Sequence, residues 1–217
     1  MLKIMVLDRS TPYSTFVEIT RIHLASIHHG ALPLLGSPFM ARMYFEIARA
    51  PKAGIWVAWK DDALVGFVAG CADLSGCFRS VLCRGGFSLG VKALPKLFSF
   101  SALRRLPTLL AYPFRTNPDS SKRNDFAAVR SELLAIAVKE GMRELGAGRL
   151  LVEAFEKALR EWDVHIYRVS TNTTETASNR FYSRMGFKPA GTQQHHALKL
   201  QLYVKQLDPT ETFSDVS

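Results

Sequence analysis

Residues 142–159 read MRELGAGRLLVEAFEKAL and combine a glycine-containing loop with the start of an amphipathic helix. Gly146 and Gly148 precede a helical pattern whose apolar residues share one face: Leu150, Leu151, Ala154, Phe155, Ala158 and Leu159. The stretch just before it, SELLAIAV at residues 131–138, has the composition of a buried strand. A glycine-containing loop between a strand and a helix is a common anion site, because the first N–H groups of a helix have no acceptor within it. The sequence therefore favours a phosphate site near residues 146–148.

Two familiar phosphate loops do not fit this stretch. A dinucleotide-binding fingerprint that begins at Gly146 needs a third glycine where the chain has Leu151. A P-loop that begins at Gly141 needs Lys, then Ser or Thr, where the chain has Ala147 and Gly148. Nucleotide hydrolysis is therefore poorly supported.

Outward from this stretch, hydrophobic periodicity and turn residues predict the other elements of the chain. Strands are expected at residues 2–8, 54–60, 63–71, 131–138, 164–171 and 197–207, and further helices at residues 10–30, 37–50 and 175–185. Gly30 and Gly186 are expected to end their helices, and Ser37 to cap the helix that has Pro38 in its first turn.

Residues 72–125 interrupt this order, and we interpret them as an insertion because regular structure resumes after them. Within residues 71–115, seven Arg and Lys stand against one Asp, so this stretch carries +6 of the formal net charge of +9. Prolines at positions 95, 107 and 113 are expected to cut any helix there into short pieces. The role of the insertion stays open between a lid over the acceptor, a surface for a homodimer, and peripheral contact with an anionic membrane.

Two motifs resemble those of the GNAT N-acetyltransferase superfamily. Arg143-x-x-Gly146-x-Gly148 resembles its coenzyme A pyrophosphate loop, whose pattern is Gln or Arg, two residues, Gly, one residue, and Gly or Ala. The stretch ASNRFYSRMGF, residues 177–187, resembles the aromatic-bearing helix ending in Gly-Phe that is its second hallmark. The order of a strand, two helices, three strands, helix, strand, helix and final strand is similar as well. The chain also resembles uncharacterised members from bacterial polysaccharide and surface-sugar loci.

The resemblance implies a fold and a domain organisation. We expect an α+β fold of three layers, in which a mixed, mainly antiparallel sheet has helices on both faces and a helical insertion precedes the fourth strand. One acyltransferase domain is expected over residues 1–207, with a C-terminal tail at residues 208–217.

The resemblance also implies how acetyl-CoA, the expected cosubstrate, would be held without a metal. A splayed strand would offer backbone groups to the pantetheine arm, and the loop would bind the pyrophosphate. The matching positions are Ile136, Ala137 and Val138 on the strand, and Arg143, Glu144, Leu145, Gly146, Ala147, Gly148 and Arg149 in the loop. Asn179 matches a coenzyme contact, and Asn172 is a weaker candidate that also suits a turn.

Two side chains match the proton carriers of related enzymes. Glu132 matches a general base, and its place on a strand face with Leu134 and Ile136 could desolvate it. The alternative is a strand-end carboxylate paired with Arg130 or another basic residue. Tyr182 shares a helix face with Asn179 and matches the acid that protonates the departing thiolate; the alternative is an aromatic core residue.

The remaining reactive side chains carry weaker signals. His28 and His29 end the first helix near a loop that in this fold lines the acceptor pocket, where His also suits a helix C-terminus for electrostatic reasons. His195 and His196 are expected to lead the last strand from a turn. The three cysteines, Cys71, Cys77 and Cys83, match neither a disulfide framework nor a zinc site and suggest thiols in a reducing cytosol.

These observations favour an enzyme that moves an acetyl group from acetyl-CoA to the primary amine of a small molecule, by direct transfer in a ternary complex. The surface-sugar resemblance suggests an amino sugar as acceptor. The alternative is a membrane- or partner-binding protein that uses the basic insertion on an inactive scaffold. A nucleic-acid module ranks last, because no binding motif accompanies the basic residues. Asp8 and Arg9 come before any apolar run reaches signal-peptide length, so a cytoplasmic location is expected.

Overall fold

The computed structural model describes residues 1–27, 35–97, 126, 128–195 and 198–208, with the backbone alone for residues 86–97 and 195. The elements in chain order are β1 (Leu2–Val6), α1 (Tyr13–Ser26), α2 (Ser37–Ile47), β2 (Ala53–Lys60), β3 (Ala63–Cys71), α3 (Leu74–Leu97), β4 (Glu132–Val138), the short 3-10 helix η3 (Arg143–Leu145), α6 (Ala147–Glu161), β5 (Ile166–Asn172), α7 (Thr176–Arg184), β6 (Lys188–His195) and β7 (Leu198–Gln206).

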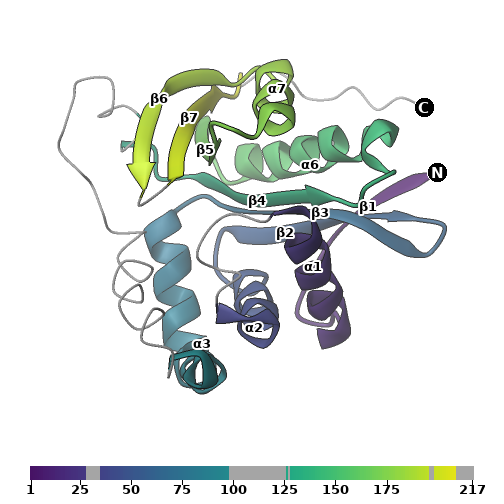
Figure 1. The fold of residues 1–217 in the computed structure, drawn as a ribbon, viewed down its shortest axis with the longest axis vertical. Helices are drawn as coiled ribbons and strands as arrows, with labels where there is room; N and C mark the ends of the chain where they lie inside the picture. The colour runs from purple at the N-terminus through teal and green to yellow at the C-terminus, as the bar shows by residue number, and fades with distance from the viewer. Residues whose placement is uncertain (28–34, 98–125, 127, 196–197, 209–217) are drawn as a thin grey trace.

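The described strands form a seven-stranded sheet in the order β1-β2-β3-β4-β5-β7-β6. Neighbouring strands are antiparallel except β4 and β5, which are parallel. Helices α1, α2 and α3 cover one face of the sheet, and α6 and α7 cover the other (Figure 1). The predicted fold class, a mainly antiparallel sheet between two helical layers with a helix inserted before the fourth strand, is confirmed.

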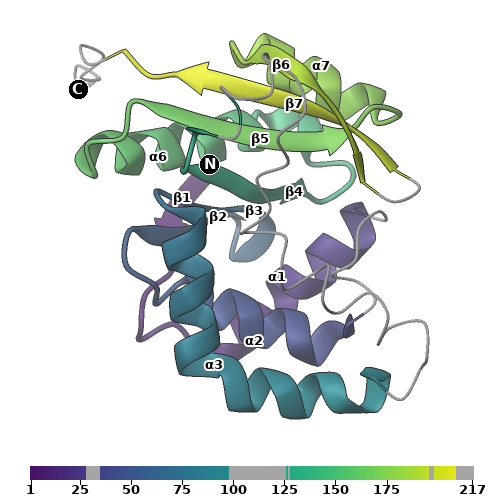
Figure 2. The same cartoon turned by 90° about the vertical axis from the view of Figure 1, so that its left-hand side faces the viewer.

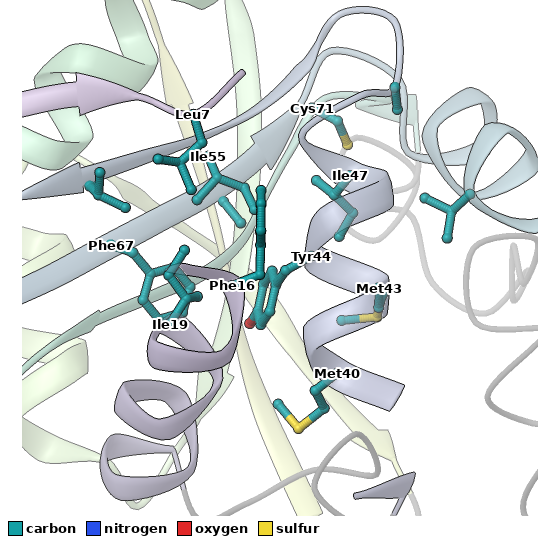
Figure 3. Packing of buried hydrophobic residues seen from close by; sticks show 14 of the residues in the cluster. Leu7, Phe16, Ile19, Met40, Met43, Tyr44, Ile47, Ile55, Phe67 and Cys71 are labelled. Carbon is teal, nitrogen blue, oxygen red and sulfur yellow. The ribbon is translucent and has the colours of Figure 1, made fainter. Parts of the chain in front are cut away.

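A hydrophobic core lies on each face of the sheet. The core under α1 and α2 brings Phe16 and Ile19 against Tyr44, with the ring centroids of Tyr44 and Phe67 5.3 Å apart (Figure 3). His23, buried in α1, places its Nδ1 2.6 Å from the hydroxyl of Tyr44. The second core joins α6 and α7 to the other face.

The local turn chemistry agrees with most of the sequence predictions. Asp61 and Asp62 join β2 to β3 with φ of +48° and +61°, the left-handed pair that a two-residue hairpin turn needs. Gly186 follows α7 with φ of +82°, as expected for a helix-ending glycine. Ser37 was expected as a cap but is the first residue of α2, and Gly36 takes the capping position without a side-chain hydrogen bond. Gly30 lies outside the described residues.

The strand β6 was not predicted. Its sequence KPAGTQQH has few apolar residues and contains Pro189 and Gly191, both of which weaken a strand pattern. Because β6 is at the edge of the sheet, a residue without an N–H group is tolerated there. The prediction that His195 leads the last strand is wrong, because His195 ends β6; His196 lies outside the described residues.

The helix α3 is longer than the prolines of the insertion suggested. It runs over 24 residues and includes Pro95, so the expectation of short pieces is wrong for residues 74–97. Pro95 falls in the last turn, so most of the helix precedes it. The paired Gly85 and Gly86 lie at the middle, and such pairs allow a helix to bend, as α3 does in Figure 2. Residues 98–125, with the other two prolines, lie outside the described part of the chain.

Candidate active site

The sheet opens between β4 and β5. β4 pairs with β3 at six residues but with β5 only at Glu132, which is opposite Arg168. In the described sheet, the remaining residues of β4 therefore have no strand partner on that edge.

The pairing of β4 with β3 fixes which backbone groups point into this opening. The N–H group of Lys139 donates to the carbonyl oxygen of Val65 at 2.8 Å. Because antiparallel pairing alternates, Ala137 also directs its polar groups to β3, whereas Ile136 and Val138 direct theirs to the open edge. Of the three strand residues predicted for the pantetheine arm, two thus offer free backbone groups and Ala137 does not.

The loop after β4 ends in the N-terminus of α6. Gly146 has φ of +74° and caps α6 without a side-chain hydrogen bond, so the first N–H groups of the helix remain available to a ligand. Arg143, Glu144 and Leu145 form η3 and are exposed, and Ala147 is buried. Arg149 is exposed and forms an ion pair with Glu153 at 2.8 Å. Gly148 packs against Phe181 of α7.

The two predicted asparagines bind other parts of the protein. The amide nitrogen of Asn179 donates to the carbonyl oxygens of Asn172 at 2.9 Å and Glu175 at 2.8 Å, and its Oδ1 accepts a hydrogen bond from Tyr203 at 2.9 Å. Asn172 is buried, and its Oδ1 accepts from the N–H group of Thr174 at 3.1 Å, which is a turn interaction. Both side chains therefore secure the connection from β5 to α7.

Tyr182 lies in the core beneath α7. Its ring centroid is 5.3 Å from that of Phe187 and 5.7 Å from that of Tyr203. Burial raises the pKa of Tyr182 above its ordinary value, and the neighbouring Tyr203 adds to the shift. The phenol is therefore protonated at neutral pH and holds its proton tightly.

Glu132 is buried, and its Oε2 accepts a hydrogen bond from Nε of Arg168 at 2.8 Å. This ion pair corresponds to the alternative of a paired carboxylate, with Arg168 as the partner; Arg130 instead pairs with Asp73 at 3.2 Å. Sequence reasoning did not single out Arg168. The available signal was a single basic residue inside the strand pattern VHIYRVST.

The environment of the Cys71 thiol disfavours its use as a nucleophile. Cys71 and Cys77 are buried, and a hydrogen bond with Cys77 together with burial raises the pKa of the Cys71 thiol, which disfavours a nucleophilic thiolate. Among the described residues, no group of three or more His, Cys, Asp or Glu side chains could hold a metal ion. His28 and His29 lie outside the described residues.

Comparisons with known proteins agree with this geometry. Residues 24–187 match the Acetyltransferase (GNAT) family, whereas no curated protein matches the chain. Similar solved structures include Ard1 from Thermoplasma volcanium, at a TM-score of 0.57 and 14% identity over 95% of this chain and 97% of that one. The ribosomal-protein-S18-alanine N-acetyltransferase from Escherichia coli has a TM-score of 0.56 and 11% identity, over 99% and 100% of the two chains. The yncA protein of Salmonella typhimurium, solved with its cofactor acetyl-CoA, has a TM-score of 0.55 and 13% identity, over 100% and 99%.

These identities are low, so the three structures demonstrate a shared fold, while the family match comes from the sequence itself. No helix in the described part of the chain is long and apolar enough to cross a membrane. The match at residues 24–187 spans most of the chain, including the open strand β4, the loop before α6 and the helix with Tyr182, and so the chain belongs to the acetyltransferase (GNAT) family.

Proposed function

We propose that this protein transfers an acetyl group from acetyl-CoA to a primary amine, by direct transfer in a ternary complex. The observation that carries the proposal is the closeness of two surfaces. Val138, at the end of the open edge of β4, lies beside Gly148 in the first turn of α6, and no side chain caps the N-terminus of that helix. An extended arm with amide groups fits the first surface, and a pyrophosphate fits the second. Acetyl-CoA is the cosubstrate that joins these two chemistries.

In this proposal the phosphate end of the cosubstrate binds at the start of α6. The N–H groups of Gly146, Ala147 and Gly148 are the donors, and the partial positive charge of the helix N-terminus adds to them. Arg143 is exposed in the same loop and can add a full positive charge. Glu144, Leu145 and Arg149 complete the loop.

The acyl end lies along β4. Ile136 and Val138 can bind the pantetheine amides through their backbone groups and can place an N–H group near the thioester carbonyl, where negative charge develops during transfer. Ala137 lies between them and keeps the strand paired to β3. Asn172 and Asn179 act by holding the start of α7 in place.

Two predictions about proton transfer belong to the proposal. Tyr182 is the acid for the departing thiolate, although its raised pKa makes the proton harder to release than that of an exposed phenol. Glu132 is the predicted base for the amine. Its Oε2 accepts a hydrogen bond from Nε of Arg168, which holds the carboxylate in one orientation.

The acceptor class is proposed from the sequence resemblance to proteins of surface-sugar loci, and it is an amino sugar. Release of free thiol from acetyl-CoA should be measured against a panel of amino sugars, with polyamines and peptide N-termini for comparison. Turnover with an amine of another class and none with amino sugars would contradict this choice.

Calorimetric titration with acetyl-CoA tests the proposed function. We expect saturable binding, weaker binding of coenzyme A that lacks its ribose phosphate, and no binding by Gly146→Val, because valine disfavours the left-handed backbone at this position. Absence of binding by the folded wild-type protein would contradict the proposal. That result would favour the alternative, a membrane- or partner-binding role of the basic insertion. Binding of the protein to anionic vesicles measures the membrane-binding role.

A further inference from the structure

The two halves of the sheet meet at one residue pair. Strands β1 to β4 form one half, and β5, β7 and β6 form the other. Within the described sheet, only Glu132 and Arg168 are paired between β4 and β5, whereas β5 and β7 pair at seven residues. The start of the opening between the halves is therefore set by this single pair.

The side chains of the same two residues form an ion pair. Nε of Arg168 lies 2.8 Å from Oε2 of Glu132, and the two side chains are 14% and 5% exposed. Arg168 also donates through Nη1 to the carbonyl oxygen of Phe126 at 2.9 Å, and its guanidinium lies 4.8 Å from the centre of that ring. The guanidinium of Arg168 is therefore held by three contacts: the carboxylate of Glu132, and the carbonyl oxygen and the ring of Phe126.

Backbone contacts at the same point bring the strands together. The N–H group of Arg168 donates to the carbonyl oxygen of Ser131 at 3.0 Å, and the hydroxyl of Ser131 donates to the carbonyl oxygen of Ile166. Beyond this point, no ladder of hydrogen bonds between β4 and β5 fixes their separation in the described sheet. In the described sheet, the contacts at the start of the opening are therefore the ones available to set the separation of β4 and β5.

We propose that Glu132 and Arg168 form a clasp that sets the opening between β4 and β5 for the pantetheine arm, an inference that rests on the proposed function. A charged hydrogen bond between buried groups is short and directional, so it holds the strands at one separation better than an apolar contact does. In this role Glu132 is a positioning residue for the cosubstrate, and the clasp does not require the proton transfer that the proposed function assigns to Glu132.

Binding measurements separate this role from that of a base, because a base is not needed for acetyl-CoA to bind. We compare Glu132→Gln, Arg168→Gln and the double variant by calorimetry. One titrant is acetyl-CoA, and the other is the part of coenzyme A that carries the phosphates and adenosine but no pantetheine arm. Glu18→Gln is the matched control, since it makes the same chemical change in a half-exposed ion pair, Glu18 with Lys139 at 3.2 Å.

We expect each single variant to weaken acetyl-CoA binding by about tenfold and the double variant to be no weaker than the worse single one, as for two residues that act as a unit. The fragment without the arm should bind to all variants as it does to wild type, because the opening does not contact it. The Glu18→Gln control should bind both titrants normally.

Three results would overturn the clasp. Normal acetyl-CoA binding by Glu132→Gln would mean that Glu132 does not set the opening, and its predicted role as a base would remain. Multiplied losses in the double variant would mean that the two residues act separately. Equal losses for both titrants would mean a general loss of structure.

If the single variants do not fold, the double variant Glu132→Leu with Arg168→Leu removes both charges from the interior and leaves neither unpaired. It should fold and still bind acetyl-CoA weakly, and normal binding would overturn the clasp. Absence of binding by wild type would overturn the proposed function itself, and the clasp with it.

Discussion

A methyl group added at Gly148 would lie 3.3 Å from Cε2 of Phe181 and 3.5 Å from its Cζ. The first turn of α6 therefore packs directly against α7, the helix that bears Tyr182 and Asn179. A methyl group added at Gly146 would meet no atom within 4 Å, but Gly146 has φ of +74°. The two glycines of the loop thus differ in their physical surroundings: at Gly148 the space beside Phe181 is tight, and at Gly146 the backbone is left-handed.

The requirement for space at Gly148 predicts a coupled effect. Gly148→Val should lower the free energy of unfolding by about 1–3 kcal/mol through overpacking against Phe181. It should also weaken acetyl-CoA binding, because α6 moves away from α7. Phe181→Leu removes part of the ring and should restore both quantities in part. Urea unfolding and calorimetry check this, and an equal loss in both backgrounds would mean that the ligand, and not Phe181, requires the glycine.

The requirement for conformation at Gly146 predicts a different pattern. Gly146→Ala should cost about 1–2 kcal/mol in unfolding free energy, because alanine disfavours the left-handed region. Gly146→Asn should cost less, since asparagine tolerates that region better. Phe181→Leu should not restore either variant. Equal losses for Ala and Asn in urea unfolding would show that another property of glycine matters here.

The burial of His23 leads us to expect a loss of stability in weak acid. Burial lowers the pKa of His23 from 6.5 to about 4, so the folded protein binds the proton less readily than the unfolded chain. The stability from neutral His23 is complete above pH 6.5 and is lost as the pH falls toward 4, by about 3 kcal/mol in total. Thermal unfolding from pH 7 to pH 4 measures this.

The matched variant is His23→Asn, whose side-chain amide lies where Nδ1 of histidine lies and can still bond the hydroxyl of Tyr44, but does not titrate in this range. Its stability should fall less steeply than that of wild type between pH 6.5 and pH 4. Parallel curves for the two proteins would show that other groups cause the acid sensitivity.

The sequence predicted the elements whose patterns are local and strong. The helix after Gly148 and the strand at residues 131–138 have periodic apolar residues, and both occur at the predicted places within a few residues. The strand β6 was missed because it takes its stability from pairing with β7, a partner beyond its own sequence. Local sequence patterns therefore do not predict a strand whose stability depends on its pairing with another strand.

The features of the candidate site likewise include some that the sequence predicted and others that it did not. A glycine loop before α6 and an open edge along β4 were expected from the motif and the family resemblance, whereas the left-handed backbone of Gly146 was not predicted. The ion pair of Glu132 with Arg168 could not be predicted, because it depends on which strand lies beside β4. The hydrogen bond from Tyr203 to Asn179 could not be predicted either, because it joins residues 24 positions apart in sequence.

One substitution at Tyr182 separates the chemical role of its hydroxyl from the packing of its ring. Tyr182→Phe keeps the ring between Phe187 and Tyr203, so we expect the unfolding free energy to change by less than about 1 kcal/mol. If the phenol supplies the proton for the departing thiolate, turnover should fall by about a hundredfold or more, while acetyl-CoA binding stays normal. Thiol release with an active amine and calorimetry measure the two effects.

The matched control is Tyr203→Phe, which removes a neighbouring hydroxyl that donates to Asn179 at 2.9 Å. It should lower the unfolding free energy by about 1 kcal/mol through the lost hydrogen bond, with a smaller effect on turnover. Because burial raises the pKa of Tyr182, wild-type turnover should not decline near pH 10 through loss of this proton. Full turnover by Tyr182→Phe would mean that the thiolate takes its proton from solvent or is released without one, and Tyr182 would then belong only to the core.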